Sequence, residues 1–303
     1  MKLKRLPYLL LLLAPAALAH EFWLAPAAYR VAVGAPVPLR LLVGEDFRGD
    51  AWARPTRKTL RLVRFGPAPT DTTDLRPALR LDSVAPAVRC SAPGTHLVLL
   101  TSRPSFIELS PDKFTAYLRA EGLDNALRQR EQDGETAAKP GREAYQRCAK
   151  TLLFATGPAA PAPPAAADTA YRRVLGLPLE IVPEQNPFRL KPGTALTVRV
   201  LRRGQPVAGA LVQLWNGGAA ATAPIKTTPT PGAAEKLAIS PPRHFTTHTN
   251  RQGRALLRLP DAGPYLLATV RMEPAPAALA ARADWLSTWA SLTFGGPATP
   301  PAR

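Results

Sequence analysis

The residue with the clearest chemistry in this sequence is a histidine that follows a hydrophobic leader. Basic residues near the start, an apolar run and the ending Ala17-Leu18-Ala19 are typical of a secretory signal peptide, here residues 1–19. Cleavage after Ala19 makes His20 the first residue of the mature chain. Its ring nitrogen and its free α-amine can then bind one metal ion together, because an α-amine has an ordinary pKa of about 7.7–8.0 and loses its proton readily.

Further ligands for such a site are spread along the chain. His96 and His248 lie in or beside predicted strands, and a second imidazole would complete a three-nitrogen site that suits Cu(II) or Ni(II). Glu21, Glu108 and Asp284 are the candidate oxygen ligands. These residues have no local ligand spacing, so the hypothesis of a metal site depends on the fold bringing them together.

Each candidate also has a structural interpretation. His20 can be an incidental residue after the cleavage point, and His96 can be a strand histidine that is hydrogen-bonded in a core. His248 can be a turn residue, and Asp284 can pair with an arginine. His244, in a stretch rich in proline and threonine, is interpreted as an exposed residue.

Two cysteines, Cys90 and Cys148, are too far apart in sequence for a zinc or redox pair. An exported chain enters an oxidising compartment, where a single disulfide can form. We therefore expect a Cys90–Cys148 disulfide, with two free buried thiols as the alternative.

Short apolar or alternating segments separated by glycine and proline predict a mainly β protein. Residues 38–43 and 94–100 have this pattern in the first half, and residues 194–201 and 254–259 have it in the second. The chain contains 35 prolines, which leaves few long helical runs. The expected architecture is two antiparallel β-sandwich domains of the immunoglobulin-like type.

One helical insertion is predicted in the first domain. Ser110-Pro111-Asp112 is a helix start signal, a capping serine followed by proline at the first helical position. The insertion is expected near residues 111–132. Residues 141–150 fit a helix or a strand equally well.

The length of 303 residues favours two domains. The boundaries that we expect are a signal peptide at 1–19, an N-terminal β-sandwich at 20–156, a Pro/Ala-rich linker at 157–175, a C-terminal immunoglobulin-like β-sandwich at 176–296 and a disordered tail at 297–303.

Composition and motifs exclude several classes of function. The net charge of +17 comes mostly from scattered arginine, without a basic block or a nucleic-acid motif, so we expect no nucleic-acid partner. The leader is shorter than the roughly 20 apolar residues of a membrane span, and no later stretch is apolar enough. The sequence also lacks the common hydrolase, phosphate-loop and dinucleotide motifs.

The sequence resembles the domain of unknown function 4198 family, whose members are often labelled periplasmic components of nickel uptake. The resemblance lies in short motifs in the same order along the chain: His20-Glu21-Phe22-Trp23-Leu24, Gly94-Thr95-His96, residues 103–109, residues 114–118, Glu121-Gly122-Leu123, residues 141–150, residues 176–180, and Asp284-Trp285 with residues 289–294. It implies nickel or cobalt uptake and a metal-transport or TonB-type uptake machinery as partner. The second domain resembles carboxypeptidase-regulatory-like, transthyretin-like modules.

Together these features predict an exported protein, periplasmic or secreted and soluble after cleavage. It binds nickel, cobalt or copper through the mature N-terminal histidine, for uptake or buffering, without catalytic turnover. Two alternatives stay open: a copper oxidase or monooxygenase with a histidine brace, and a non-metal envelope or adhesion module.

Overall fold

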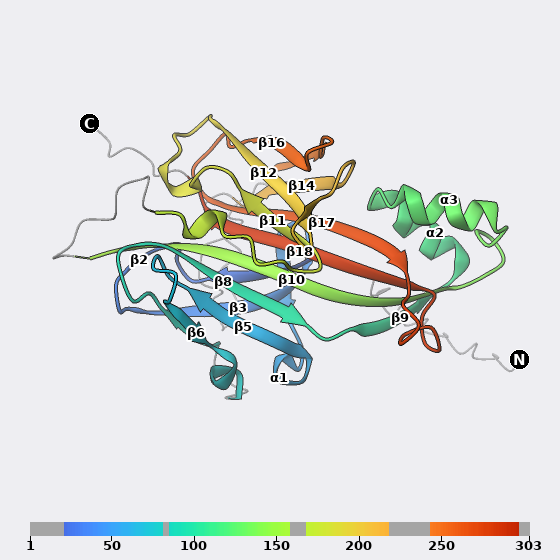
Figure 1. Ribbon diagram of the computed structural model, residues 1–303, viewed down its shortest axis with the longest axis horizontal. Helices are drawn as coiled ribbons and strands as arrows, with labels where there is room; N and C mark the ends of the chain where they lie inside the picture. The colour runs from blue at the N-terminus through green and yellow to red at the C-terminus, as the bar shows by residue number, and fades with distance from the viewer. Residues whose placement is uncertain (1–20, 81–84, 158–167, 218–242, 297–303) are drawn as a thin grey trace, which may run out of the picture.

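The computed structural model describes residues 21–80, 85–157, 168–217 and 243–296 (Figure 1). The predicted signal peptide, His20 and the predicted tail lie outside the described residues. Residues 158–167 of the predicted linker 157–175 also lie outside them.

A ten-stranded sheet forms the centre of the molecule (Figure 1). Its main path runs β15, β14, β17, β18, β10, β8, β5 and β6, and β2 and β9 also pair with β10. Its strands are β2 (Arg30–Ala32), β5 (Thr59–Phe65), β6 (Thr72–Asp74), β8 (Gly94–Ser102), β9 (Ser105–Leu109), β10 (Gly141–Thr156), β14 (Leu211–Asn216), β15 (Arg243–His248), β17 (Pro264–Pro274) and β18 (Trp285–Gly295).

Two smaller sheets, each of four strands, complete the β structure. The first, which we call the N-terminal sheet, contains β1 (Glu21–Pro26), β3 (Pro36–Glu45), β4 (Arg48–Ala51) and β7 (Ala87–Arg89). The second contains β11 (Glu180–Pro183), β12 (Ala195–Arg202), β13 (Gln205–Pro206) and β16 (Arg254–Arg258). The mainly β class expected from the sequence is therefore confirmed.

The two smaller sheets cover opposite faces of the central sheet. Side chains along a strand alternate between its faces, and β8 shows the consequence directly. Leu97 and Leu99 pack with β11, β12 and β16. Val98 and Leu100 pack instead with residues of β1 and β3. All four side chains are fully buried, which explains why this strand reads as a continuous apolar run.

Both halves of the chain contribute to the central sheet. β10 from the first half pairs in parallel with β18 from the second half, from Glu143–Trp285 to Thr151–Thr293. β18 also pairs antiparallel with β17 along its whole length. The sequence suggested two separate antiparallel sandwiches, and this parallel pairing across the halves was not evident from it.

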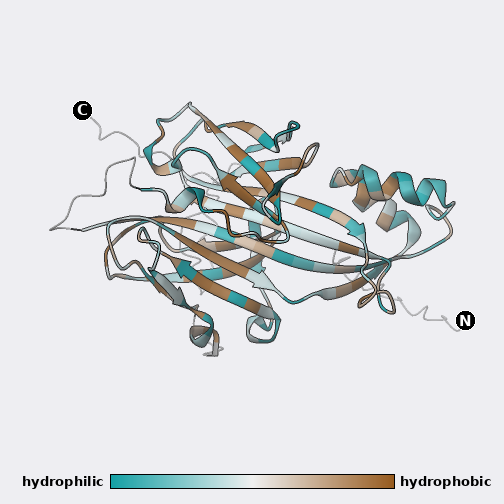
Figure 2. Ribbon diagram, in the orientation of Figure 1, coloured by the Kyte–Doolittle hydropathy of each residue, from teal (hydrophilic) through white to brown (hydrophobic). Residues whose placement is uncertain are grey.

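The helical insertion is confirmed as two helices, α2 (Pro111–Ala120) and α3 (Asp124–Gln132). Gly122 separates them with a φ of +62°, a left-handed conformation that glycine adopts without strain. Phe114, Tyr117 and Leu118 pack on Trp289 and its neighbours in β17 and β18. The outer surface of α3 is hydrophilic (Figure 2). The remaining short helices are α1 (Pro55–Lys58), η1 (Arg76–Arg80), η2 (Ala170–Arg172) and η3 (Pro187–Arg189).

The described end of the predicted linker is part of the core. Asp168 is fully buried, and its carboxylate accepts hydrogen bonds from the backbone and hydroxyl of Thr95 and from the amide of Asn186. A surface connector does not bury a carboxylate in this way, so residues from 168 onward belong to the folded unit. Within the residues that the structure describes, no helix is both long and apolar enough to cross a membrane.

Candidate functional site

His96, a predicted metal ligand, is held inside the protein by hydrogen bonds on both ring nitrogens. Its Nε2 lies 2.8 Å from the carbonyl oxygen of Ala92, and its Nδ1 lies 3.1 Å from Nη1 of Arg64. Arg64 also forms an ion pair with Asp71 at 2.6 Å. Burial, reinforced by the positive charge of Arg64, lowers the pKa of His96. A neutral ring with both nitrogens engaged has no free electron pair for a metal ion.

His248 and His96 do not lie together. His248 ends β15 and is exposed, whereas His96 is in β8. Five strand-to-strand steps separate these strands in the central sheet, about 24 Å at a spacing of about 4.8 Å per step. One metal ion cannot bind both imidazoles across this distance.

The candidate oxygen ligands Glu108 and Asp284 lie close to arginine and lysine side chains. Asp284 forms an ion pair with Arg142 at 2.7 Å and lies 3.8 Å from Nζ of Lys139. The hydrogen bonds from Arg142 hold the pKa of Asp284 below its usual range. Glu108 is exposed on β9, where its backbone pairs with that of Arg142. The side chain of Asp284 is therefore accounted for by its protein partners, whereas Glu108 is an exposed strand residue.

The predicted disulfide is absent from the structure. Cys90 and Cys148 are free, buried thiols. Cys90 belongs to the hydrophobic cluster under the N-terminal sheet, and Cys148 belongs to the cluster on the opposite face of the central sheet. Burial raises the pKa of each thiol to about 12, so both remain protonated and unreactive.

Glu21 is different, because it lies among other buried carboxylates. It begins β1, and β1 lies along β18, where Ser291 and Thr293 donate hydrogen bonds to the carbonyl oxygens of Phe22 and Leu24. Trp289, two residues before Ser291, stacks on Tyr117 of α2 with ring centroids 6.2 Å apart. The start of β1 therefore meets the helical insertion on the same face of the central sheet.

Three glutamates gather at this junction, and we call them the carboxylate cluster: Glu21 of β1, Glu121 at the end of α2, and Glu143 of β10. Burial raises the pKa of Glu21 to about 7, with the charges of Glu45 and Asp46 adding to the rise. Burial also raises the pKa of Glu121 to about 8, reinforced by the charges of Glu21, Glu143 and Glu45. Glu121 therefore lies close enough to Glu21 and Glu143 to feel their charges.

Glu143 is the most deeply buried member of the cluster, with 0% of its surface exposed. Its Oε1 accepts hydrogen bonds from the hydroxyls of Ser287 and Tyr117, the latter at 3.3 Å. Its Oε2 has no hydrogen-bond partner within the described residues. Burial raises the pKa of Glu143 to about 7, although these two hydroxyls oppose the rise. An unpartnered buried oxygen is costly and calls for an explanation, such as a functional role or a bound ion or water molecule.

Polar groups from β14 and β15 border the cluster. Gln213 donates a hydrogen bond from Nε2 to Glu121 at 3.1 Å, and its Oε1 lies 3.1 Å from Nε2 of His244. The His244 ring stacks on Trp215 at 4.8 Å, and Trp215 donates from Nε1 to Asp46 at 3.3 Å. A chain of side chains thus links an exposed histidine to the buried carboxylates.

The described residues do not form a complete metal site on their own. No group of three or more His, Cys, Asp or Glu side chains in that part of the chain converges closely enough to hold an ion. No lysine, arginine or histidine among the described residues forms an ion pair with Glu21, Glu121 or Glu143. The cluster therefore brings together three carboxyl groups without a described cation at ion-pair distance.

Two members of the cluster were missed by sequence reasoning. Glu143 falls in residues 141–150, whose pattern did not distinguish helix from strand. Glu121 could have been noticed in the sequence, because it follows a predicted helix. A negative charge at the C-terminal end of a helix is unfavourable, and such exceptions are expected at functional sites. His244, interpreted as merely exposed, is exposed but lies in β15 beside the cluster.

Comparison with protein families gives one match. A family model described as Domain of unknown function (DUF4198) matches residues 17–273, which is most of the chain. A comparison with curated proteins gives no match.

Comparison with solved structures gives distant similarities, three of which follow. The chain is similar to the D0-D1 domain of Intimin, with 8% identity and a TM-score of 0.18, over 89% of this chain and 96% of that one. It is similar to the two tandem V-type regions of VCBP3, a v-region-containing chitin binding protein, with 9% identity and a TM-score of 0.21, over 90% and 99%. Similarity to alpha-2-macroglobulin from Escherichia coli has 8% identity and a TM-score of 0.19, over 91% and 16%.

Proposed function

Because the chain belongs to the family described as Domain of unknown function (DUF4198), a description that names no activity, we propose a function from the site itself. The mature protein binds one divalent transition-metal ion, nickel, cobalt or copper, at its N-terminus. It buffers or delivers the ion and does not turn over a substrate.

The observation that carries this proposal is the carboxylate cluster beside position 20. Glu21, Glu121 and Glu143 have pKa values of about 7 to 8, because burial disfavours their charged forms and, for Glu121, the charges of Glu21 and Glu143 add to the rise. A divalent cation would remove this penalty, because an opposite charge nearby favours the ionised carboxylate. Strongly perturbed pKa values cluster at functional sites, which supports a role for these carboxylates beyond packing.

The ligand set differs from the one expected from the sequence. We assign the α-amine and ring nitrogen of His20 as the nitrogen donors, and Glu21 and Glu121 as the oxygen donors. Glu143, which is more deeply buried, would add negative charge that stabilises the bound cation without contacting it. Nitrogen and carboxylate donors together suit nickel, cobalt and copper, whose affinities are high in the divalent series. His96 and Asp284 have no place in this set, because their polar atoms already have protein partners.

The proposed biological setting rests on the leader predicted from the sequence and on the resemblance to proteins labelled as nickel-uptake components, not on the fold. With an export signal at residues 1–19, the protein would work in the periplasm or outside the cell. There it would receive nickel or cobalt and pass the ion to an uptake machinery in the envelope. The ion could be released again when the carboxylates take up protons, which happens near neutral pH at raised pKa values.

Calorimetric titration of Ni(II), Co(II) and Cu(II) into the mature protein with a true His20 N-terminus tests the proposal. We expect binding of one ion per chain. Addition of a single alanine ahead of His20 should abolish tight binding, because the α-amine then no longer belongs to the histidine. Glu121→Gln should weaken binding about tenfold or more, since it removes one charged ligand.

Glu108→Gln is the matched control, because Glu108 is an exposed glutamate outside the carboxylate cluster. It should leave the affinity unchanged. Binding that survives both the added alanine and Glu121→Gln would contradict the N-terminal site. Oxidation of ascorbate by the copper-loaded protein with turnover would favour the histidine-brace enzyme over a binding protein.

A further inference from the structure

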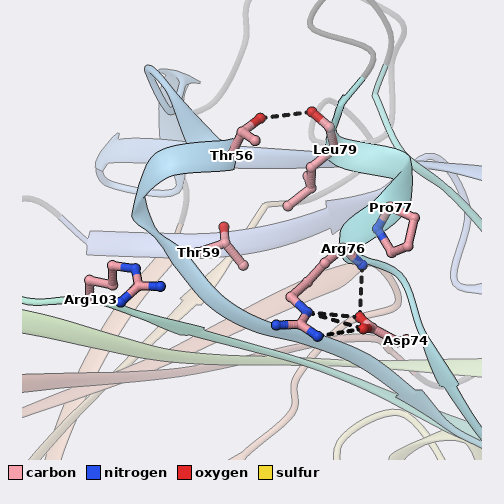
Figure 3. A pocket seen from close by; sticks show the side chains of 7 residues that line it. All are labelled: Thr56, Thr59, Asp74, Arg76, Pro77, Leu79 and Arg103. Carbon is pink, nitrogen blue, oxygen red and sulfur yellow. Dashed lines mark hydrogen bonds and ion pairs between the residues drawn. The ribbon is translucent and has the colours of Figure 1, made fainter.

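A second candidate site lies at the opposite edge of the central sheet from β15. A cavity of about 350 Å³ opens between α1, β5, β6 and η1 (Figure 3). This volume is at the lower end of the range for pockets that hold small organic ligands. The cavity shares none of its lining residues with the carboxylate cluster, so it is independent of the proposed metal site.

The charged groups that line the cavity leave one positive charge in excess. Arg76 is bound to Asp74 by a salt bridge of 2.7 Å and by two further contacts of its Nε, each 3.1 Å. These hydrogen bonds from Arg76 hold the pKa of Asp74 below its ordinary value, so this pair is neutral as a whole. Arg103 also lines the cavity, and no described carboxylate lies within ion-pair distance of it. The guanidinium of Arg103 is therefore available to an anion.

A buried hydroxyl adds a second polar group. Thr59 is 7% exposed, and its Oγ1 has no hydrogen-bond partner among the described residues. Figure 3 shows this hydroxyl on the side of Thr59 that faces the Thr56–Leu79 contact, with Arg103 and Arg76 on either side of the residue. In that contact Thr56 donates its hydroxyl to the carbonyl oxygen of Leu79 at 2.8 Å. Of these two threonine hydroxyls, the one of Thr59 is therefore free to donate a hydrogen bond to a ligand.

The surroundings reinforce the positive charge. The backbone amide of Arg103 bonds to the carbonyl oxygen of Lys58 at 2.8 Å, so the two side chains start close together. Lys58 and the buried Arg147 both lie over the ring of Trp52, at 5.4 and 5.8 Å from its centroid. Neither forms an ion pair with a described carboxylate. An approaching anion therefore meets a field of uncompensated cations.

We propose that this cavity binds a small organic anion through a carboxylate or phosphate group. Arg103 pairs with the anionic oxygens, and Thr59 donates a hydrogen bond to one of them. Arg76, fixed by Asp74, forms the opposite wall. Pro77 and Leu79 supply apolar surface for the rest of the ligand. The small volume excludes a folded macromolecule as the occupant.

Ligand titration followed by NMR or calorimetry, with the full mature chain, tests this proposal. The probes are inorganic phosphate, succinate and glycerol 3-phosphate, with glycerol as the uncharged control. We expect at least one anion to bind and glycerol not to bind. Preference for succinate would identify a carboxylate ligand, and preference for a phosphate probe would identify a phosphate ligand.

Three variants make the assignment specific. Arg103→Ala should weaken binding about tenfold or more, because it removes a charge-assisted hydrogen bond. Arg57→Ala removes the same charge from an exposed position of α1 outside the lining, and it should change the affinity by less than about twofold. Thr59→Val should weaken binding roughly fivefold without loss of stability, because it replaces an unpartnered buried hydroxyl by an isosteric methyl group.

Each result decides the question. Selective loss in Arg103→Ala and Thr59→Val supports the site. Equal loss in Arg57→Ala and Arg103→Ala would show diffuse attraction to a basic surface and overturn the proposal. Absence of binding by all three anions would overturn it as well. Neither outcome bears on the N-terminal metal site, whose probes and variants are different.

Discussion

The three glutamates of the carboxylate cluster show how burial, as the largest cause, can change the chemistry of a side chain. Glu21 and Glu143 are both buried, and Glu121 is half-buried at the end of α2. Removal from water disfavours the charged form of a carboxyl group and raises its pKa. The protein therefore carries protonated glutamates at pH values where exposed glutamates are ionised.

The pH dependence of stability follows from these pKa values. Between the ordinary value of 4.5 and the raised values of about 7 to 8, the folded chain binds more protons at this cluster than the unfolded chain. The free energy of unfolding contributed by the cluster therefore falls as the pH rises through that window. Thermal denaturation of the metal-free protein should show a melting temperature that decreases from about pH 5 to about pH 8.

Glu121→Gln identifies the source of this trend, because it removes the carboxyl group with the highest pKa of the three. The variant should flatten the decrease by several degrees, given that about 1 kcal/mol changes the melting temperature by roughly 2–4 °C in large domains. Glu108→Gln serves as the control and should follow the parent protein. A slope identical in all three proteins would mean that the cluster does not titrate in this range.

His96 shows the opposite case, in which a residue type with metal chemistry has a structural role. Its ring bridges Arg64 and the backbone at Ala92, inside a network that also contains Asp71. The sequence predicts that His96 lies in a strand. It does not predict that Arg64, 32 positions earlier, donates a hydrogen bond to its Nδ1. Distinguishing ligand from structural histidine requires the partners, and those are set by the pairing of β5 with β8.

At the scale of elements, a buried ion pair joins β10 to β11. Nζ of Lys150 lies 3.0 Å from Oε2 of Glu180, and the two side chains are 1% and 0% exposed. Glu180 also accepts hydrogen bonds from the backbone amides of Leu175 and Leu177. The pair therefore fixes the second small sheet and the segment before it on the central sheet.

Removal of one partner should be strongly destabilising. Lys150→Met leaves the Glu180 carboxylate buried without its cation, and we expect a loss of about 3–5 kcal/mol in the free energy of unfolding. Urea denaturation of Lys150→Met, Glu180→Gln and the double variant measures the coupling. The double variant should lose clearly less than the sum of the single losses. Additive losses would show that the two groups stabilise the fold independently.

The sequence predicted the elements better than their arrangement. The alternating segments became strands and the Ser110-Pro111-Asp112 signal became the start of α2, because both depend on neighbouring residues. The pairing of β10 with β18 joins residues about 142 positions apart, and no local pattern encodes it. For the same reason Glu21 could be named as a candidate ligand, whereas its proximity to Glu121 could not.

At the scale of the whole molecule, the two halves depend on each other. The hydrophobic cluster on the face of β11 and β12 takes Leu152 and Phe154 from β10 as well as Leu292 and Phe294 from β18. A fragment of residues 168–303 would lose β10 and expose the cluster residues that pack against it. We expect it to be unfolded or aggregated by circular dichroism and amide NMR.

Coexpression of residues 20–157 with residues 168–303 is the matching control. The two fragments together should give a folded complex with one cooperative thermal transition. Cooperative unfolding of the 168–303 fragment alone would show that the second half is an independent domain, as the sequence first suggested.

The position of β18 also sets an order of events during synthesis. The ribosome synthesises β10 early, but β18, which pairs with it, is synthesised only after more than a hundred further residues. Until then one long edge of β10 offers unpaired amide and carbonyl groups, the kind of template that recruits other strands. Folds dominated by such distant pairings form slowly. The growing chain therefore has a vulnerable interval in which a holding chaperone, or an export route that keeps it extended, would protect it from aggregation.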